Sequence, residues 1–189
     1  MDAQGRVSLH LRAHSLAEMD EATMIVRFLE GVASKPYQLW GFSSENADLP
    51  ILRQRAIALG APTPGFYDLT ARRSDEHHLD LLNLVGAYNG AAKPSLNELA
   101  VACGIPGKLE TKGSDEADLY LDGKVCEIVE YNETDAVTTH LVMLRVAYQA
   151  GKLTAEQYAA ETAAVWEMVD GLAGKGHAGM ARFRAVGKE

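Results

Sequence analysis

The sequence predicts an α/β (or α+β) domain in which helices flank a central mixed sheet, and three observations support this. Strand-like and helix-like segments alternate in the first half of the chain, whereas helical periodicity dominates the second half. The composition, with 47% hydrophobic and 23% charged residues, is ordinary for a soluble globular protein. A chain of 189 residues is long enough to bury one core of its own.

The first half contains a strand, a helix, and then a strand–loop–helix unit. Residues 5–14 alternate apolar and polar side chains, which predicts a strand with one buried face. Residues 17–34 show helical spacing, and the apolar run 37–42 predicts a buried strand. The polar turn 43–48 and a helix over 49–60 follow. Because α/β proteins place their sites at the carboxyl ends of strands, this turn is a candidate site.

The second half is predicted to be mainly helical. We expect one domain over residues 1–170, followed by a basic, glycine-rich and loosely ordered tail over 171–189. The remaining expected segments are a loop at 61–78, a strand or helix start at 79–88, a short helix at 95–103, a polar connector at 108–118, and two helices at 124–151 and 154–169.

Charge and cysteine usage exclude several classes of protein. The formal net charge of -8 argues against a binder that holds DNA by phosphate neutralisation alone, but it does not exclude a nuclease that uses bound metal ions. Two cysteines outside any C-x-x-C pair exclude a disulfide framework. No apolar run could span a membrane, and the first residues lack the pattern of a secretory signal. We therefore expect a cytoplasmic protein without membrane contact.

The strongest chemical signal is a tyrosine and an aspartate at helical spacing, Tyr131 and Asp135. Positions i and i+4 of a helix share one face, so the phenol and the carboxylate would point out together. A helical pair of this kind is structural in most proteins, so the spacing alone is a weak signal. Its weight depends on the rest of the chain.

Several further segments occur in a fixed order around this pair. They are Leu39–Leu52 (LWGFSSENADLPIL), His78–Leu82 (HLDLL), Cys103–Lys108 (CGIPGK) and Glu130–Ala136 (EYNETDA). In this order they resemble the motifs of the predicted 3'-5' exonucleases related to the proofreading domain of family B DNA polymerases. That family belongs to the DnaQ-like, ribonuclease H-like superfamily, among the exonucleases named DEDDy for four acidic residues and a tyrosine. The resemblance covers roughly residues 20–157.

The resemblance implies a site and a reaction. Asp48 matches the aspartate of the family's second motif, and Tyr131 and Asp135 match its last motif. The resemblance makes Asp48 and Asp135 ligands of Mg²⁺ or Mn²⁺ and makes Tyr131 the residue that orients the attacking water. The implied reaction is two-metal hydrolysis of phosphodiester bonds at the 3' ends of single-stranded DNA, within a ribonuclease H-like sheet.

Other residues keep two interpretations each. Lys108 and Arg55 are candidates for contact with nucleic acid, and the alternative is a solvated surface. Arg53, Arg72 and Arg73 extend this basic group, with Phe66 and Tyr67 as stacking candidates. Asp80 is either an auxiliary acidic residue or a structural hydrogen-bond acceptor. His78 is expected to pack or to form a hydrogen bond rather than to bind a metal.

The chain also departs from the family pattern. No D-x-E followed by a fitting strand precedes Asp48, so two of the four metal ligands and the first strand of the sheet are expected to be missing. Ser43 and Ser44 stand where the family prefers Asn-Gly, and Ala47 replaces a bulky aromatic residue. Two explanations remain open, a coding sequence read from a late start and a degenerate relative. The corresponding alternative function is a non-catalytic module that binds nucleic acid or protein.

A missing first strand would expose strand edges within the sheet. The sequence therefore suggests the hypothesis that a second copy of the chain covers this edge in a homodimer.

Overall fold

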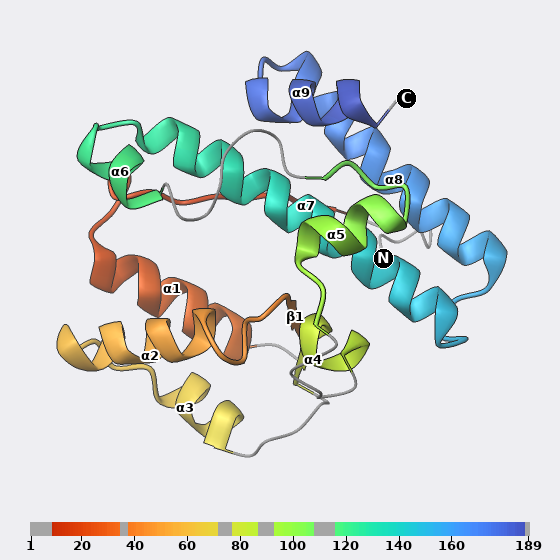
Figure 1. Cartoon of the computed structure of the whole chain (residues 1–189). Coiled ribbons are helices and arrows are strands. Elements are labelled where there is room, and N and C mark those ends of the chain that lie inside the picture. Colours follow the sequence, from red (N-terminus) through yellow and green to blue (C-terminus); the bar gives the residue numbers. More distant parts are fainter. Residues whose placement is uncertain (1–8, 35–37, 72–76, 87–92, 108–115, 188–189) are drawn as a thin grey trace. The chain divides into compact units, whose positions relative to one another are not determined.

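The computed structural model describes residues 9–34, 38–71, 77–86, 93–107 and 116–187 (Figure 1). The chain divides into two compact units. The mixed unit comprises His14–Pro94, and the helical unit comprises Met1–Ala13 together with Ser95–Glu189. Each unit is described by itself.

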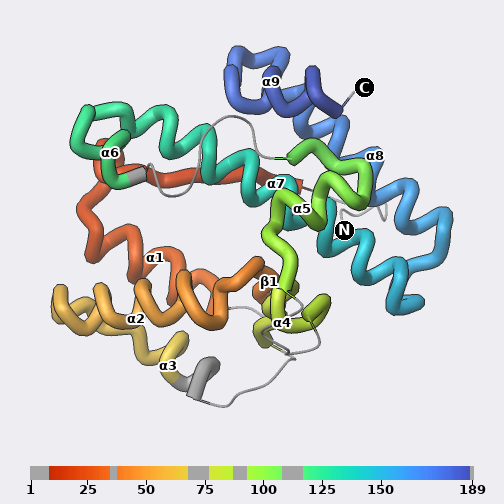
Figure 2. The backbone as a smooth tube through the Cα atoms, in the orientation of Figure 1, coloured from red at the N-terminus to blue at the C-terminus, as the bar shows by residue number. Residues whose placement is uncertain are grey.

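The mixed unit joins two short parallel strands to four helices. Its elements are α1 (Glu21–Ala33), β1 (Leu39–Gly41), α2 (Asp48–Ala58), α3 (Pro64–Ala71), β2 (His78–Asp80) and α4 (Leu81–Val85). β1 and β2 pair in parallel, with Leu39 opposite His78 and Gly41 opposite Asp80. Helices α2 and α3 both pack against α1, as the tube in Figure 2 shows for α1 and α2. The core consists of Ile25, Leu29, Leu49, Ala56 and Phe66.

The helical unit is built around two long helices. Its elements are α5 (Leu96–Ala102), α6 (Glu116–Leu121), α7 (Val125–Gln149), α8 (Ala155–Gly174) and α9 (Ala178–Val186). Helices α7, α8 and α9 pack on one another, and α5 and α6 contact α7 (Figure 1). The buried core of this unit consists of Val137, Leu141, Leu144, Val165, Val169, Met180 and Phe183. Capping boxes start α5 at Ser95 and α8 at Thr154, the residues at which the two predicted helices begin.

Several expected elements are confirmed and others are not. The strand at 37–42, the helix at 49–60 and the long helix at 124–151 correspond to β1, α2 and α7. The segment 79–88 satisfies both of its interpretations, because β2 passes directly into α4. The loop prediction for 61–78 is wrong for Pro64–Ala71, which forms α3. Residues 9–14 form no strand, and residues 5–8 lie outside the described part of the chain.

The end of the chain is more ordered than its composition suggests. α8 continues to Gly174, and α9 follows over Ala178–Val186. Met180 and Phe183 of α9 are fully buried, and the Phe183 ring stacks on Trp166 at 5.7 Å between ring centroids. The expectation of a loosely ordered tail is therefore wrong for this helix, because its apolar side chains complete the core.

The described strands form a sheet of two, β1 and β2. The helix-rich mixed architecture agrees with the predicted class. The larger ribonuclease H-like sheet stays a prediction.

Candidate functional site

The carboxyl ends of the parallel strands carry a buried aspartate that organises its surroundings. Asp80 is 6% exposed. Its Oδ1 accepts hydrogen bonds from the backbone N–H groups of Ser43 at 3.0 Å and Leu82 at 2.9 Å, and its Oδ2 accepts from the N–H of Glu45 at 2.9 Å. Asp80 is also the N-cap of α4. Of its two interpretations, the hydrogen-bond acceptor is the one that these contacts support.

The β1–α2 loop, residues 42–47, folds back tightly over the end of β1. A Cβ on Gly41 would lie 2.1 Å from the hydroxyl oxygen of Ser44, so the turn has no room for a side chain at that position. Ser43 has a φ of 63°, a left-handed conformation that costs a non-glycine residue roughly 1–2 kcal/mol. The contacts of Asp80 hold the amides of this loop in place.

Further side-chain contacts brace the same loop. The Ser44 hydroxyl lies 2.9 Å from Nε2 of His78, which confirms His78 as a hydrogen-bonding residue. The Asn83 amide donates to Glu45 at 2.7 Å, and Lys93 Nζ donates to the Asn83 carbonyl oxygen at 2.7 Å. Sequence reasoning missed Glu45, Asn83 and Lys93. The register of β1 against β2 brings these residues together, and no local pattern encodes that register.

Asp48 is the first residue of α2 and follows directly from this braced loop. The N-cap position, Ala47, provides no side-chain hydrogen bond, so the loop backbone sets where the helix begins. The Asp48 side chain is exposed. A carboxylate in the first turn is favoured by the helix dipole, and the exposed position leaves it accessible to a ligand.

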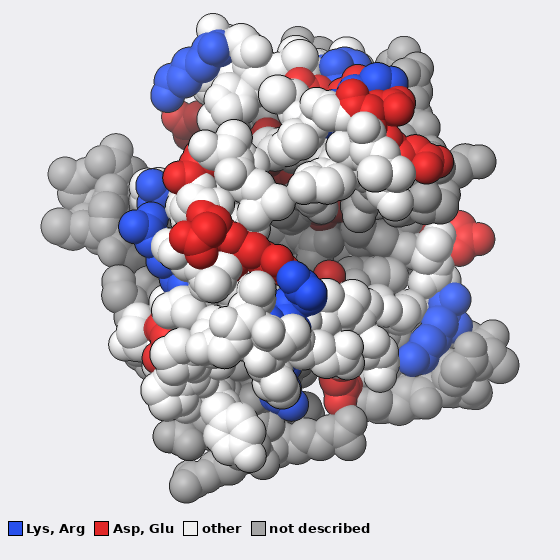
Figure 3. Space-filling model, turned by 90° about the vertical axis from the view of Figure 1, so that its left-hand side faces the viewer, with Lys and Arg blue, Asp and Glu red and all other residues white. Residues whose placement is uncertain are grey.

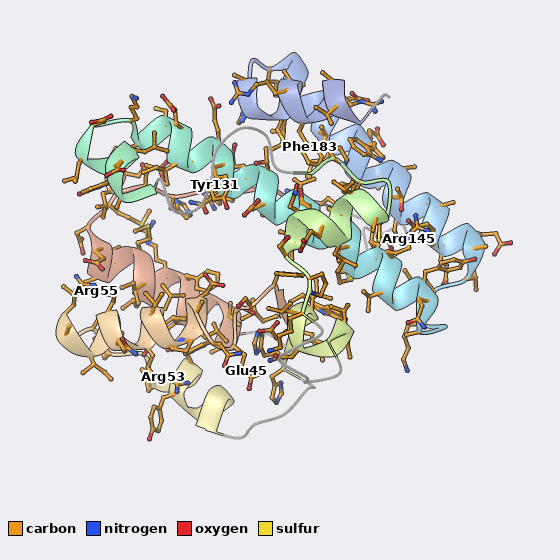
Figure 4. The ribbon with its side chains drawn as sticks, in the orientation of Figure 1. Glu45, Arg53, Arg55, Tyr131, Arg145 and Phe183 are labelled. Carbon is orange, nitrogen blue, oxygen red and sulfur yellow. The ribbon has the colours of Figure 1, made fainter. Side chains whose placement is uncertain are left out.

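Arg55 lies further along α2 and pairs with a carboxylate of α1. Its guanidinium donates to both oxygens of Glu21, at 2.6 Å each. This hydrogen-bonded pair lowers the pKa of Glu21 and raises that of Arg55. Figure 4 shows Arg55 and Glu45 towards opposite ends of α2. Contact between Arg55 and nucleic acid stays a prediction, and it would compete with Glu21.

The other half of the predicted site lies on α7. Tyr131 and Asp135 are one turn apart on this helix, and both side chains are partly buried. Figure 4 labels Tyr131 on α7. The neighbouring Thr134, Val137 and Thr138 are buried, so the pair lies beside the packed stripe of the helix. The helical spacing predicted from the sequence is therefore confirmed.

Helix α9 is tied to a different side of α7. Arg182 pairs with Glu130, and His177 Nδ1 lies 3.8 Å from Glu133. Successive residues of an α-helix are rotated by about 100°, so Glu130 and Glu133 point well away from the side that carries Tyr131 and Asp135. These two contacts of α9 therefore lie on a different side of α7 from Tyr131 and Asp135.

A partly buried histidine, His140, lies one to two turns beyond Asp135 on α7. The Nε2 atom of His140 is buried and forms no hydrogen bond with the described residues. Burial lowers the pKa of His140 below the ordinary 6.5, because the charged ring would lose its hydration. His140 is therefore a neutral packing residue at neutral pH.

The expected basic group is only partly represented among the described side chains. Phe66 is 2% exposed and belongs to the core, so it cannot stack on a base, whereas Tyr67 is 65% exposed. Lys108, Arg72 and Arg73 lie outside the described residues. On the face drawn in Figure 3, the described Lys and Arg side chains are interspersed with acidic ones.

The donor chemistry of Asp48 and Asp135 suits a hard divalent cation, because both offer carboxylate oxygens. Asp48 belongs to the mixed unit and Asp135 to the helical unit. Within the described part of the chain, no group of three or more His, Cys, Asp or Glu side chains could hold a metal ion. Nor do the described residues include a helix long and apolar enough to cross a membrane.

Comparison with protein families identifies the chain's relatives. A family profile described as "Predicted 3'-5' exonuclease related to the exonuclease domain of PolB" matches residues 2–185. Because the match covers nearly the whole chain, the protein belongs to this family. Searches of curated proteins and of solved structures found no match.

Proposed function

We propose that the protein is a 3'-5' exonuclease that hydrolyses the terminal phosphodiester bond of single-stranded DNA. The observation that carries this proposal is the family match across residues 2–185, which includes Asp48, Tyr131 and Asp135. The paired placement of Tyr131 and Asp135 on α7 supports it.

Each of the three residues has a proposed role. Asp48 and Asp135 bind Mg²⁺ or Mn²⁺, and a bound metal supplies a water of lowered pKa and offsets the negative charge of the phosphate. Tyr131 holds the attacking water by a hydrogen bond from one turn along α7. Asp48 keeps its exposed position because the β1–α2 loop fixes the start of α2.

The metal ions also account for the net charge. A chain with a formal charge of -8 repels a polyanion unless cations intervene. Binding of the nucleic acid should therefore depend on divalent metal, and EDTA should abolish it. Arg55 and Lys108 are proposed as contacts to the backbone of the strand.

The experiment is digestion of a 5'-labelled single-stranded oligonucleotide with Mg²⁺ or Mn²⁺. Wild type should give a ladder that shortens from the 3' end, and Asp135→Asn should lose it. Asp170→Asn is the matched control, because Asp170 pairs with Arg184 on the exposed side of α8 and has no role in the proposed site. An equal loss in both variants, or a ladder that survives Asp135→Asn, would show that Asp135 is not a catalytic ligand.

A folded wild-type protein that yields no ladder would favour the second candidate, a non-catalytic module that binds nucleic acid or protein. A metal-dependent shift of the labelled oligonucleotide in a native gel, without cleavage, would identify nucleic acid as its ligand.

A further inference from the structure

The β1–α2 loop has a conformation that needs external support. Ser43 lies in the left-handed region at φ 63°, and Gly41 has no space for a Cβ against Ser44. Strained backbone of this kind persists only where surrounding contacts determine it. The α2 helix that follows has no side-chain cap of its own at Ala47.

The contacts that determine this loop converge on Asp80. Gly41 and Asp80 are partners in the parallel register, so Asp80 lies beside the end of β1. From there its carboxylate reaches the N–H groups of Ser43 and Glu45, on either side of Ser44. Hydrogen bonds to a buried, ionised carboxylate are about twice as strong as those between neutral groups.

We propose that Asp80 is the positioning residue that fixes the β1–α2 loop and, through it, the metal-binding carboxylate of Asp48. This assignment rests on the proposed function for the role of Asp48, but the support of the loop is a property of the fold alone. In this role Asp80 acts through backbone amides and not by contact with the substrate or the metal.

The two carboxylate oxygens of Asp80 accept hydrogen bonds from different residues, which allows a selective test. Oδ1 accepts from Ser43, Leu82 and Asn83, whereas Oδ2 accepts from Glu45. In Asp80→Asn the remaining carbonyl oxygen can take the place of Oδ1, and asparagine caps helices about as well as aspartate. The amide nitrogen, however, cannot accept from Glu45. The variant should keep α4 and the bond to Ser43, and it should lose the bond that holds the loop at Glu45.

A second aspartate of the same unit provides the matched control. Asp20 is the N-cap of α1, where Oδ1 accepts from the Thr23 N–H at 2.9 Å and Oδ2 from the Thr23 hydroxyl at 2.7 Å. Asp20→Asn removes the same charge and one acceptor oxygen at a helix start, but these two Asp20 hydrogen bonds go to Thr23 of α1 and not to the β1–α2 loop. Both variants are made in the full chain.

The first readout is amide hydrogen exchange. Asp80→Asn should accelerate exchange at Glu45 by about tenfold or more, as expected for a lost bond to a charged acceptor, while Leu82 changes little. Asp20→Asn should leave Glu45 unchanged. Equal exchange at Glu45 in Asp80→Asn and wild type would overturn the proposal, whether or not the protein cleaves DNA.

The second readout separates positioning from general stability. In Asp80→Asn the kcat for oligonucleotide cleavage should fall by roughly 10–100-fold, the usual effect of losing an outer partner of a metal ligand, with KM little changed. Asp20→Asn should keep both constants. A wild-type enzyme without activity contradicts the proposed function but leaves the exchange result to decide the role of Asp80. Unchanged kcat despite a loosened loop would contradict the link from the loop to Asp48.

Discussion

The two units hold their candidate site residues in contrasting ways. In the mixed unit, Asp48 follows a short loop that is fixed by partly buried polar contacts to Asp80, His78 and Asn83. In the helical unit, Tyr131 and Asp135 lie on a 25-residue helix whose position is set by an apolar core. Polar contacts depend strongly on direction, whereas an apolar core tolerates small shifts. The position of Asp48 in the mixed unit should therefore depend more on single polar side chains than the positions of Tyr131 and Asp135 do.

The largest expected loss of stability comes from removing a side chain from the apolar core that packs against α7. Phe183→Ala should destabilise the helical unit by about 3–5 kcal/mol, because it removes a fully buried ring that stacks on Trp166. Denaturant unfolding followed by fluorescence measures this loss. Phe28→Ala, at a 44% exposed aromatic of α1, serves as the control and should cost far less. Similar losses in the two variants would contradict the assigned core.

A smaller effect should follow from crowding the loop of the mixed unit. Gly41→Ala places a methyl group against Ser44 and should cost about 1–3 kcal/mol, with loss of the loop conformation. Gly31→Ala is the matched control, since nothing lies within 4 Å of the added atom in α1. That control should stabilise the helix by about 0.5–1 kcal/mol. Opposite signs for the two changes are the expected result of thermal unfolding, and a shared sign would contradict the close contact at Gly41.

The smallest expected effect is a pH dependence in the helical unit. The folded state depresses the pKa of His140 below 6.5, so the unfolded chain takes up a proton first as the pH falls. His140 therefore contributes no penalty above about pH 6.5 and an increasing one as the pH falls below that value towards its folded pKa. His140→Gln should flatten this part of the stability curve, measured by denaturant unfolding between pH 7.5 and 5.0. A curve of unchanged slope would mean that another group is responsible.

Local patterns predicted the elements well where caps and periodicity agree. Thr154 starts α8 and the spacing of Tyr131 and Asp135 is helical, because both features depend on neighbours along one chain segment. α3 was missed although Pro64 is at its first position, where proline favours a helix. Its charge- and proline-rich composition outweighed that signal.

Features that depend on contacts between distant parts of the chain could not be predicted from the sequence. The role of Asp80 was open between two interpretations, because its partners at Ser43 and Glu45 are set by the pairing of β1 with β2. The order of α9 was also missed, since its glycine-rich surroundings gave no hint that Met180 and Phe183 complete a core. Asp48, Tyr131 and Asp135 were found by resemblance, and their joint action stays a prediction.

The central proposal is that Asp48 and Asp135 both take part in the proposed hydrolysis. The most direct test is a double-mutant cycle on kcat for 3'-5' cleavage, with Asp48→Asn, Asp135→Asn and the double variant. Each single substitution should lower kcat by at least about 100-fold. The double variant should have about the same kcat as the less active of the two single variants, because the effects of residues that act as a unit are not additive. Near wild-type kcat in either single variant, or losses that multiply in the double, would contradict the claim.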